Sequence, residues 1–139
     1  MAFNRRVAVA LMGLSLAAQS GETFKARLSP LPADARTRAD LAGSGSASAV
    51  LTGTKLGITG SFEGLRSAAT TASLHSAVSA GVKGPAIGDL TISKATSGTI
   101  SGSIELTPQQ LTSLRKGGLY VQIHSEKAPD GVLWGWLLR

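Results

Sequence analysis

The chain has 139 residues, of which 42% are hydrophobic, and this length and composition are enough for one domain around one core. Its formal net charge is +6. It contains no cysteine, which excludes disulfides, thiol catalysis, thiolate metal sites and c-type haem attachment. The basic residues are scattered without a ladder of aromatic residues, so no nucleic-acid partner is predicted and the charges are expected to be solvated. The alternative is a weak patch for an anionic polymer, made by Lys25, Arg27, Arg36 and Arg38.

Residues 1–20 are typical of a secretory signal peptide. Arg5 and Arg6 precede an apolar stretch that is shorter than the roughly 20 residues needed to cross a bilayer. Small residues between Ala17 and Ser20 suit cleavage, which would lower the formal net charge from +6 to +4. We therefore expect Sec-type export to the periplasm or the medium, with residues 21–139 as a single domain that keeps no stable membrane anchor.

The first half of the mature chain alternates apolar and polar residues. Phe24–Leu28 predicts a half-buried first strand, followed by a polar loop over 30–43 with one short helical turn. The segment 43–65 is rich in glycine, serine and threonine, but it alternates in the same way. This alternation favours two short strands joined by a turn at Thr52–Lys55 over a disordered segment.

Three more strands are expected before the predicted helix. Thr70–Ser79 predicts a strand with one apolar face, and Leu90–Ser93 and Gly98–Leu106 predict two others. The glycine-rich segment 81–88 is interpreted as a loop. It lacks the Gly-Lys-Ser/Thr ending and the following helix of a phosphate-binding loop.

One short helix is expected at about residues 107–116, because Thr107 suits the N-cap, a proline follows it, and two glycines end the segment. Gly117–Leu138 then predicts a closing hairpin. Trp134 and Trp136 share one side of its second strand, and we expect them in the core. An outward orientation would instead make an aromatic strip for a partner or a sugar. Together these patterns predict an all-β fold, a Greek-key β-sandwich or barrel with one short helix.

The two histidines are the candidate site residues. His75 and His124 both lie on the polar side of a predicted strand, so their imidazoles would approach each other if the strands are neighbours. Neutral imidazole binds copper and zinc, which makes a periplasmic copper- or zinc-binding protein the alternative function. The interpretation that we favour is a local hydrogen bond for each ring inside a polar cluster, with Ser73, Ser76 and Ser125 as the candidate partners. No serine lies in a nucleophile-elbow motif and no pair of acids stands out, so no catalytic residues and no enzyme activity are predicted.

Several short motifs occur in order over about residues 22–138. These motifs are Phe24-x-Ala26-x-Leu28, Gly45-Ser46-Ala47, Phe62-x-Gly64-Leu65, Ala72-x-Leu74-His75, Gly81-x-x-Gly84-Pro85, Leu111-x-x-Leu114-x-x-Gly117, Tyr120-Val121-x-Ile123-His124 and Pro129-x-Gly131-x-x-x-Gly135-x-Leu137. Their order and spacing resemble the CHRD domain, which is repeated in chordin and found singly in many bacterial exported proteins. The family often has His-x-His where this chain has Ser73-x-His75.

The resemblance implies an all-β Greek-key-like fold in an extracytoplasmic location, and it implies no established activity. We therefore expect an exported binding or structural module with an unidentified protein or envelope partner. No resident cofactor is expected, unless copper or zinc binds at His75 and His124.

Overall fold

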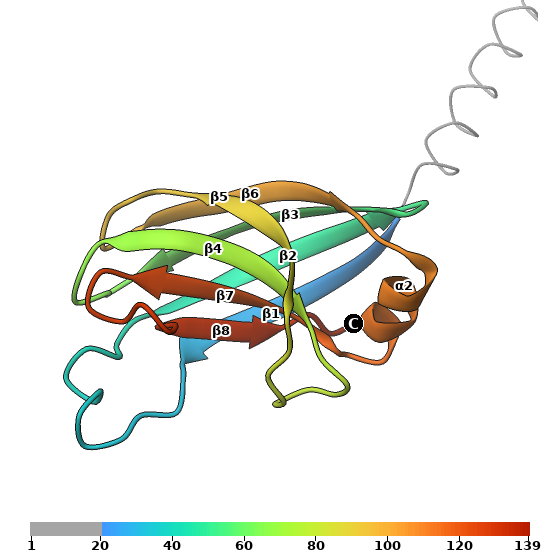
Figure 1. The fold of residues 1–139 in the computed structure, drawn as a ribbon. Coiled ribbons are helices and arrows are strands. Elements are labelled where there is room, and N and C mark those ends of the chain that lie inside the picture. The colour runs from blue at the N-terminus through green and yellow to red at the C-terminus, as the bar shows by residue number, and fades with distance from the viewer. Residues whose placement is uncertain (1–20) are drawn as a thin grey trace, which may run out of the picture.

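The computed structural model describes residues 21–139, so the predicted signal peptide lies outside the described range. Within that range eight antiparallel strands close into a barrel, and one short helix lies at one end of it (Figure 1). The elements are β1 (Glu22–Pro30), β2 (Ser44–Thr52), β3 (Lys55–Glu63), β4 (Ala69–Ser76), β5 (Ala86–Ile92), β6 (Gly98–Glu105), α2 (Pro108–Arg115), β7 (Leu119–Ser125) and β8 (Leu133–Trp136). The predicted all-β class with one short helix is confirmed.

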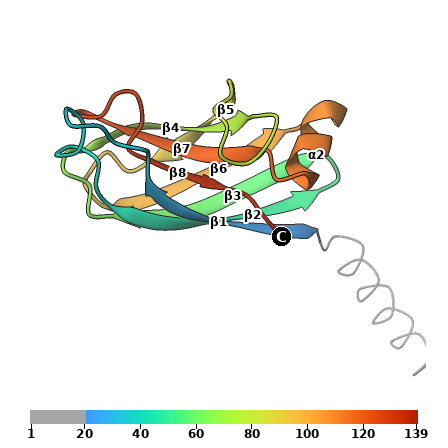
Figure 2. The same cartoon turned by 90° about the horizontal axis from the view of Figure 1, so that it is seen from below.

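The strand order around the barrel is β1-β2-β3-β6-β5-β4-β7-β8. Two connections skip neighbouring strands, so that β3 lies beside β6 and β7 lies beside β4. The second arrangement places β7 next to β4, the first of the three consecutive strands β4, β5 and β6, which is the Greek-key pattern, while β3 lies next to the last of these three. Helix α2 belongs to the second of these connections, and it lies at the same end of the barrel as the C-terminus (Figure 2).

The interior of the barrel is filled by the apolar side of each strand. Its largest fully buried side chains include Phe24, Leu56, Ile58, Leu74 and Ile123. Full burial of a side chain of this kind stabilises the fold by about 1.5–3 kcal/mol, so this interior supplies most of the driving force for folding. The predicted alternation from Phe24 to Leu28 is confirmed, since the three apolar residues of that segment are buried and the basic residues between them are exposed.

Local signals are confirmed where they act within a few residues. The β2–β3 hairpin turns at Thr52–Lys55, with Gly53 at a φ of 63°, a left-handed conformation that favours glycine. The Thr107 side chain accepts a hydrogen bond from the backbone N–H of Gln110, and the Gln110 side chain accepts one from the backbone N–H of Thr107. This capping box starts α2 as predicted.

Two predicted boundaries are wrong, and strand pairing explains both. The strand expected over Thr70–Ser79 ends at Ser76: the bond from the Ala77 N–H to the Gly118 carbonyl is the last one on the β7 side, and beyond it the chain leaves the sheet, with Val78 86% exposed. The second half of the glycine-rich segment 81–88 is not a loop but the start of β5. Its pairing with β4 satisfies the backbone there and outweighs the low strand propensity of glycine.

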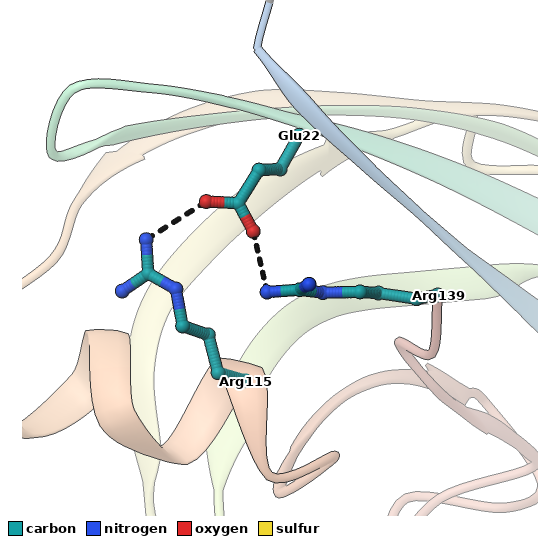
Figure 3. A network of polar contacts seen from close by, with 3 residues as sticks. All are labelled: Glu22, Arg115 and Arg139. Atoms are coloured by element: carbon teal, nitrogen blue, oxygen red, sulfur yellow. Dashed lines mark hydrogen bonds and ion pairs between the residues drawn. The ribbon is translucent and has the colours of Figure 1, made fainter.

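An exposed ion-pair network joins the two ends of the described chain (Figure 3). One carboxylate oxygen of Glu22 accepts a hydrogen bond from Arg115 at 2.8 Å, and the other accepts one from Arg139 at 2.6 Å. Glu22 therefore connects β1 with the end of α2 and with the C-terminal residue. These are the ion pairs found within residues 21–139.

Candidate functional site

Four rings gather on the outer side of β4, β7 and β8, and we call His75, Tyr120, Trp134 and Trp136 the aromatic cluster. The strand register places His75 opposite Tyr120, and Tyr120 opposite Trp136. The His75 ring stacks on Tyr120 with centroids 4.8 Å apart, and Trp136 lies 4.2 Å from Tyr120. Trp134 meets Tyr120 edge-on at 5.7 Å and lies 5.8 Å from Trp136. Each ring therefore restrains its neighbours.

The expectation that the tryptophans lie in the core is wrong. Leu133 and Leu137 are fully buried and fill the interior along the last strand, so the alternate positions Trp134 and Trp136 face outward and are partly exposed. Gly135, between them, lies on the same side of β8 as these leucines, and a Cβ there would overlap the Arg27 carbonyl oxygen, because β1 and β8 approach closely. The outward aromatic strip, the alternative from the sequence, is the arrangement found.

Tyr120 anchors the cluster to the loop that follows β4. It is 1% exposed although it lies on the outer side of β7. Its hydroxyl accepts a hydrogen bond from the Gly84 N–H at 2.9 Å and donates one to the Gly84 carbonyl at 3.1 Å. The loop 77–85 is therefore fixed at its base by the ring that supports the tryptophans. In the sequence Gly84 stands out only as part of the Gly81-x-x-Gly84-Pro85 motif, which does not indicate its contact with Tyr120.

Each histidine has partners for both ring nitrogens, as the local hydrogen-bond interpretation predicts. His75 Nδ1 lies 2.8 Å from the Gly84 carbonyl oxygen and its Nε2 lies 2.8 Å from the Ser73 hydroxyl. A carbonyl oxygen only accepts, so Nδ1 carries the proton of the neutral ring and Nε2 accepts from Ser73. The same reasoning applies to His124, whose Nδ1 lies 2.8 Å from the Pro129 carbonyl oxygen and whose Nε2 lies 3.3 Å from the Gln122 amide.

The structure places both imidazoles on the same outer face, as predicted, but it does not bring them together. His75 pairs with Tyr120, which lies four residues before His124 on β7. At about 3.3 Å per residue the two positions are roughly 13 Å apart, whereas nitrogens that share a zinc ion each lie at about 2.0–2.1 Å from it. Within residues 21–139 no group of three or more His, Asp or Glu side chains is placed to hold a metal ion. Copper or zinc binding at His75 and His124 stays a prediction.

Two basic side chains border the aromatic cluster on β1. Ser29 pairs with Trp134 and Lys25 bridges to Leu138, and the same register places Arg27 opposite Trp136. Lys25 and Arg27 are exposed, and neither forms an ion pair within the described part of the chain.

Beyond β1 the outer surface changes to short hydroxyl side chains. A shallow depression of about 540 Å³ crosses β1, β2 and β3. Lys25 and Arg27 belong to its lining, together with small residues that include Ser46, Ser48 and Thr59. The outer face thus offers, in order, partly exposed rings, two unpaired cations and a series of hydroxyls.

A comparison with protein families identifies the fold. The family model described as the CHRD domain matches residues 24–137, which is nearly the whole described chain. No curated protein and no solved structure matches the chain significantly. Among residues 21–139 no helix is long and apolar enough to cross a membrane. CHRD domains are typically extracellular and are not a known family of enzymes. The chain belongs to the CHRD domain family.

Proposed function

We propose that the chain is an exported, non-catalytic binding module that contacts its ligand through the aromatic cluster. The observation that carries this proposal is the pair of partly exposed tryptophans on a sheet face, held in place by the buried Tyr120 and by His75. Large rigid rings lose little conformational entropy when they bind, and they supply much contact area. This makes the outer side of β7 and β8 the best-prepared contact surface.

Binding fits this surface better than catalysis. A general base needs a nitrogen or a carboxylate that reaches the reacting group, and both nitrogens of His75 already have protein partners. The Ser73 hydroxyl points at His75 Nε2, but that imidazole turns its other nitrogen to a carbonyl and not to a carboxylate. The third member of a Ser-His-acid triad is therefore missing from its place.

Export is part of the proposal. It is supported by the signal-peptide pattern of residues 1–20 and by the usual extracellular location of CHRD domains. A fold without cysteine also keeps its stability in an oxidising compartment without needing disulfides. The partner is expected in the cell envelope or outside the cell.

The two tryptophans of the chain both belong to the cluster, so their indole N–H signals in an NMR spectrum report on this surface alone. We expect a ligand from a panel of glycans and solubilised envelope components to shift at least one indole signal in a saturable manner. Trp136→Ala should weaken that ligand, while the exposed Thr99→Ala on β6 serves as the matched control. Ligands that bind with no change at either indole would refute the proposal.

A further inference from the structure

We infer that the ligand of this surface is an acidic polysaccharide, with a sugar ring on Trp136 and its carboxylate or sulfate groups at Arg27 and Lys25. The inference rests on the proposed function, because it uses the same tryptophans. It adds the neighbouring part of the outer face, where the cations and hydroxyls of β1, β2 and β3 continue from the rings of β8.

The charge of this region favours an anion. Lys25 and Arg27 stand two residues apart on the outer side of β1, both exposed and both without an ion pair in the described chain. Strands β1, β2 and β3 contain two carboxylates, of which Glu22 is paired with two arginines and Glu63 ends β3. Cations whose charge is not neutralised by the protein bind carboxylate and sulfate groups with charge-assisted hydrogen bonds.

The rings beside these cations favour a sugar. A pyranose ring has an apolar face of C–H groups and an edge of hydroxyls, so it matches a surface that has an aromatic face next to hydrogen-bonding groups. Trp136 supplies the aromatic face, and its contact with Tyr120 at 4.2 Å holds it in place before the ligand arrives. The register that places Arg27 opposite Trp136 sets a cation one strand away from the ring.

The hydroxyls continue the site across the next strands. Ser48 pairs with Lys25 on one side and with Thr59 on the other, and Ser46 pairs with Arg27 in the adjacent row. Strands in a sheet are about 4.8 Å apart, so the path from β8 through β1 and β2 to β3 covers roughly 14 Å. This length accommodates a few consecutive sugar residues and indicates a polymer instead of a single sugar.

Isothermal titration calorimetry with hexagalacturonate tests this assignment. Its fully methyl-esterified form keeps the rings and removes the charges, and a heparin hexasaccharide presents sulfates instead of carboxylates. We expect the wild-type chain to bind at least one acidic oligosaccharide about tenfold or more tighter than the neutral ester in about 0.15 M salt. Arg27→Ala and Trp136→Ala should each weaken it about tenfold.

The control variant is Lys94→Ala, which removes an exposed charge from the turn between β5 and β6 and should leave the affinity unchanged. Circular dichroism and the melting temperature establish that each variant is folded. If Trp136→Ala does not fold, Arg27→Ala still tests the inference. A loss with Lys94→Ala as large as that with Arg27→Ala would show non-specific attraction and overturn the inference. Equal affinity for a single-stranded DNA oligomer would overturn it too.

The failure of this inference is distinct from the failure of the proposed function. If the methyl ester binds as tightly as the acid and Trp136→Ala removes both, the aromatic surface binds ligands but the acidic class is refuted. If none of the acidic oligosaccharides binds, the acidic class is refuted as well. Only indole signals that stay unchanged under every ligand that binds would refute the proposed function.

Discussion

The two outer sides of this barrel differ although both rest on the same apolar interior. The outer side of β4, β7 and β8 carries rings that bury one another, and Tyr120 there is as inaccessible as the core. The outer side of β2, β3 and β6 carries short hydroxyl residues such as Ser46, Thr59 and Ser101, which are exposed. The side of β4, β7 and β8 therefore carries a second layer of packed side chains outside the barrel, while the side of β2, β3 and β6 carries mainly short, solvent-exposed side chains.

On one of these two sides the same residues contribute to the stability of the fold and to the proposed contact surface. On the aromatic side the residues that prepare the contact surface also hold the loop 77–85 through Gly84. On the hydroxyl side the outer residues contact mainly solvent, so stability there depends on the inner residues and on the close approach of the strands.

Tyr120→Ala should have the largest effect. It removes a buried ring together with two hydrogen bonds to Gly84, and we expect the free energy of unfolding to fall by about 3–5 kcal/mol. Urea denaturation followed by circular dichroism measures this loss. Tyr120→Phe keeps the ring and loses only the hydroxyl, so about 1–2 kcal/mol is expected.

The matched change on the other outer side is Thr59→Ala, which should alter the free energy of unfolding by at most about 0.5 kcal/mol. A loss for Thr59→Ala comparable to that for Tyr120→Ala would remove the contrast between the two sides.

Gly60→Ala tests the close approach of strands on the hydroxyl side. An added Cβ at Gly60 would overlap the Ser46 carbonyl oxygen and lie 3.0 Å from the Ala47 Cα, so the backbone has to move. We expect a loss of about 1–3 kcal/mol, measured in the same denaturation experiment.

Gly57→Ala is the control on the same strand. The only neighbour that its Cβ would meet within 4 Å is the Val50 carbonyl oxygen, at an ordinary distance of 3.9 Å. Its stability should therefore stay within about 0.5 kcal/mol of the wild type. Equal losses for Gly57→Ala and Gly60→Ala would mean that general strand propensity, and not strand contact, sets the requirement for glycine.

His75→Ala should have a smaller effect than the loss of Tyr120, because the central ring of the cluster remains. It removes the stacking on Tyr120 and a hydrogen bond to the Gly84 carbonyl, which together contribute about 1–2 kcal/mol. Amide hydrogen exchange at Gly84 should accelerate in this variant. His124→Ala should leave exchange at Gly84 unchanged, since that ring bonds instead to Gln122 and Pro129.

The smallest effect is expected at the exposed Glu22. The hydrogen bond from Arg115, reinforced by the charges of Arg115 and Arg139, lowers the pKa of this carboxyl below its ordinary value of 4.5. A lowered folded-state pKa stabilises the fold above the unfolded-state value, and that contribution is lost as the pH falls through the folded-state pKa. Acid titration of stability below about pH 4.5 should therefore be shallower in Glu22→Gln than in the wild type.

Salt should reduce this contribution in the wild type, because the network is exposed. Some acid dependence should remain in Glu22→Gln, since backbone N–H groups of Thr37 and Arg36 also lower the pKa of Asp34. Identical acid limbs for the wild type and Glu22→Gln would exclude a stabilising role for the network.

Local chemistry explains what could be predicted from the sequence. The capping box at Thr107 and the turn at Thr52–Lys55 depend on residues that are a few positions apart, and both are found as expected. The alternation along Leu119–Ser125 correctly assigned Tyr120 and His124 to the outer side of the last hairpin. It left open how far apart the two histidines lie, because that depends on the register between β4 and β7.

The sequence by itself determined the all-β class, the inward and outward sides of most strands and the local hydrogen bonding of the histidines, since these follow from periodicity and short-range contacts. Only the tertiary structure decided that the tryptophans face outward and that Arg27 stands opposite Trp136. The first depends on the register of β8 against β7, which sets Trp136 opposite Tyr120, and the second depends on β8 closing the barrel against β1, more than a hundred residues away along the chain. Pairing between strands sets which parity of a strand meets the interior and which side chains lie opposite one another, and no pattern within one strand contains that information.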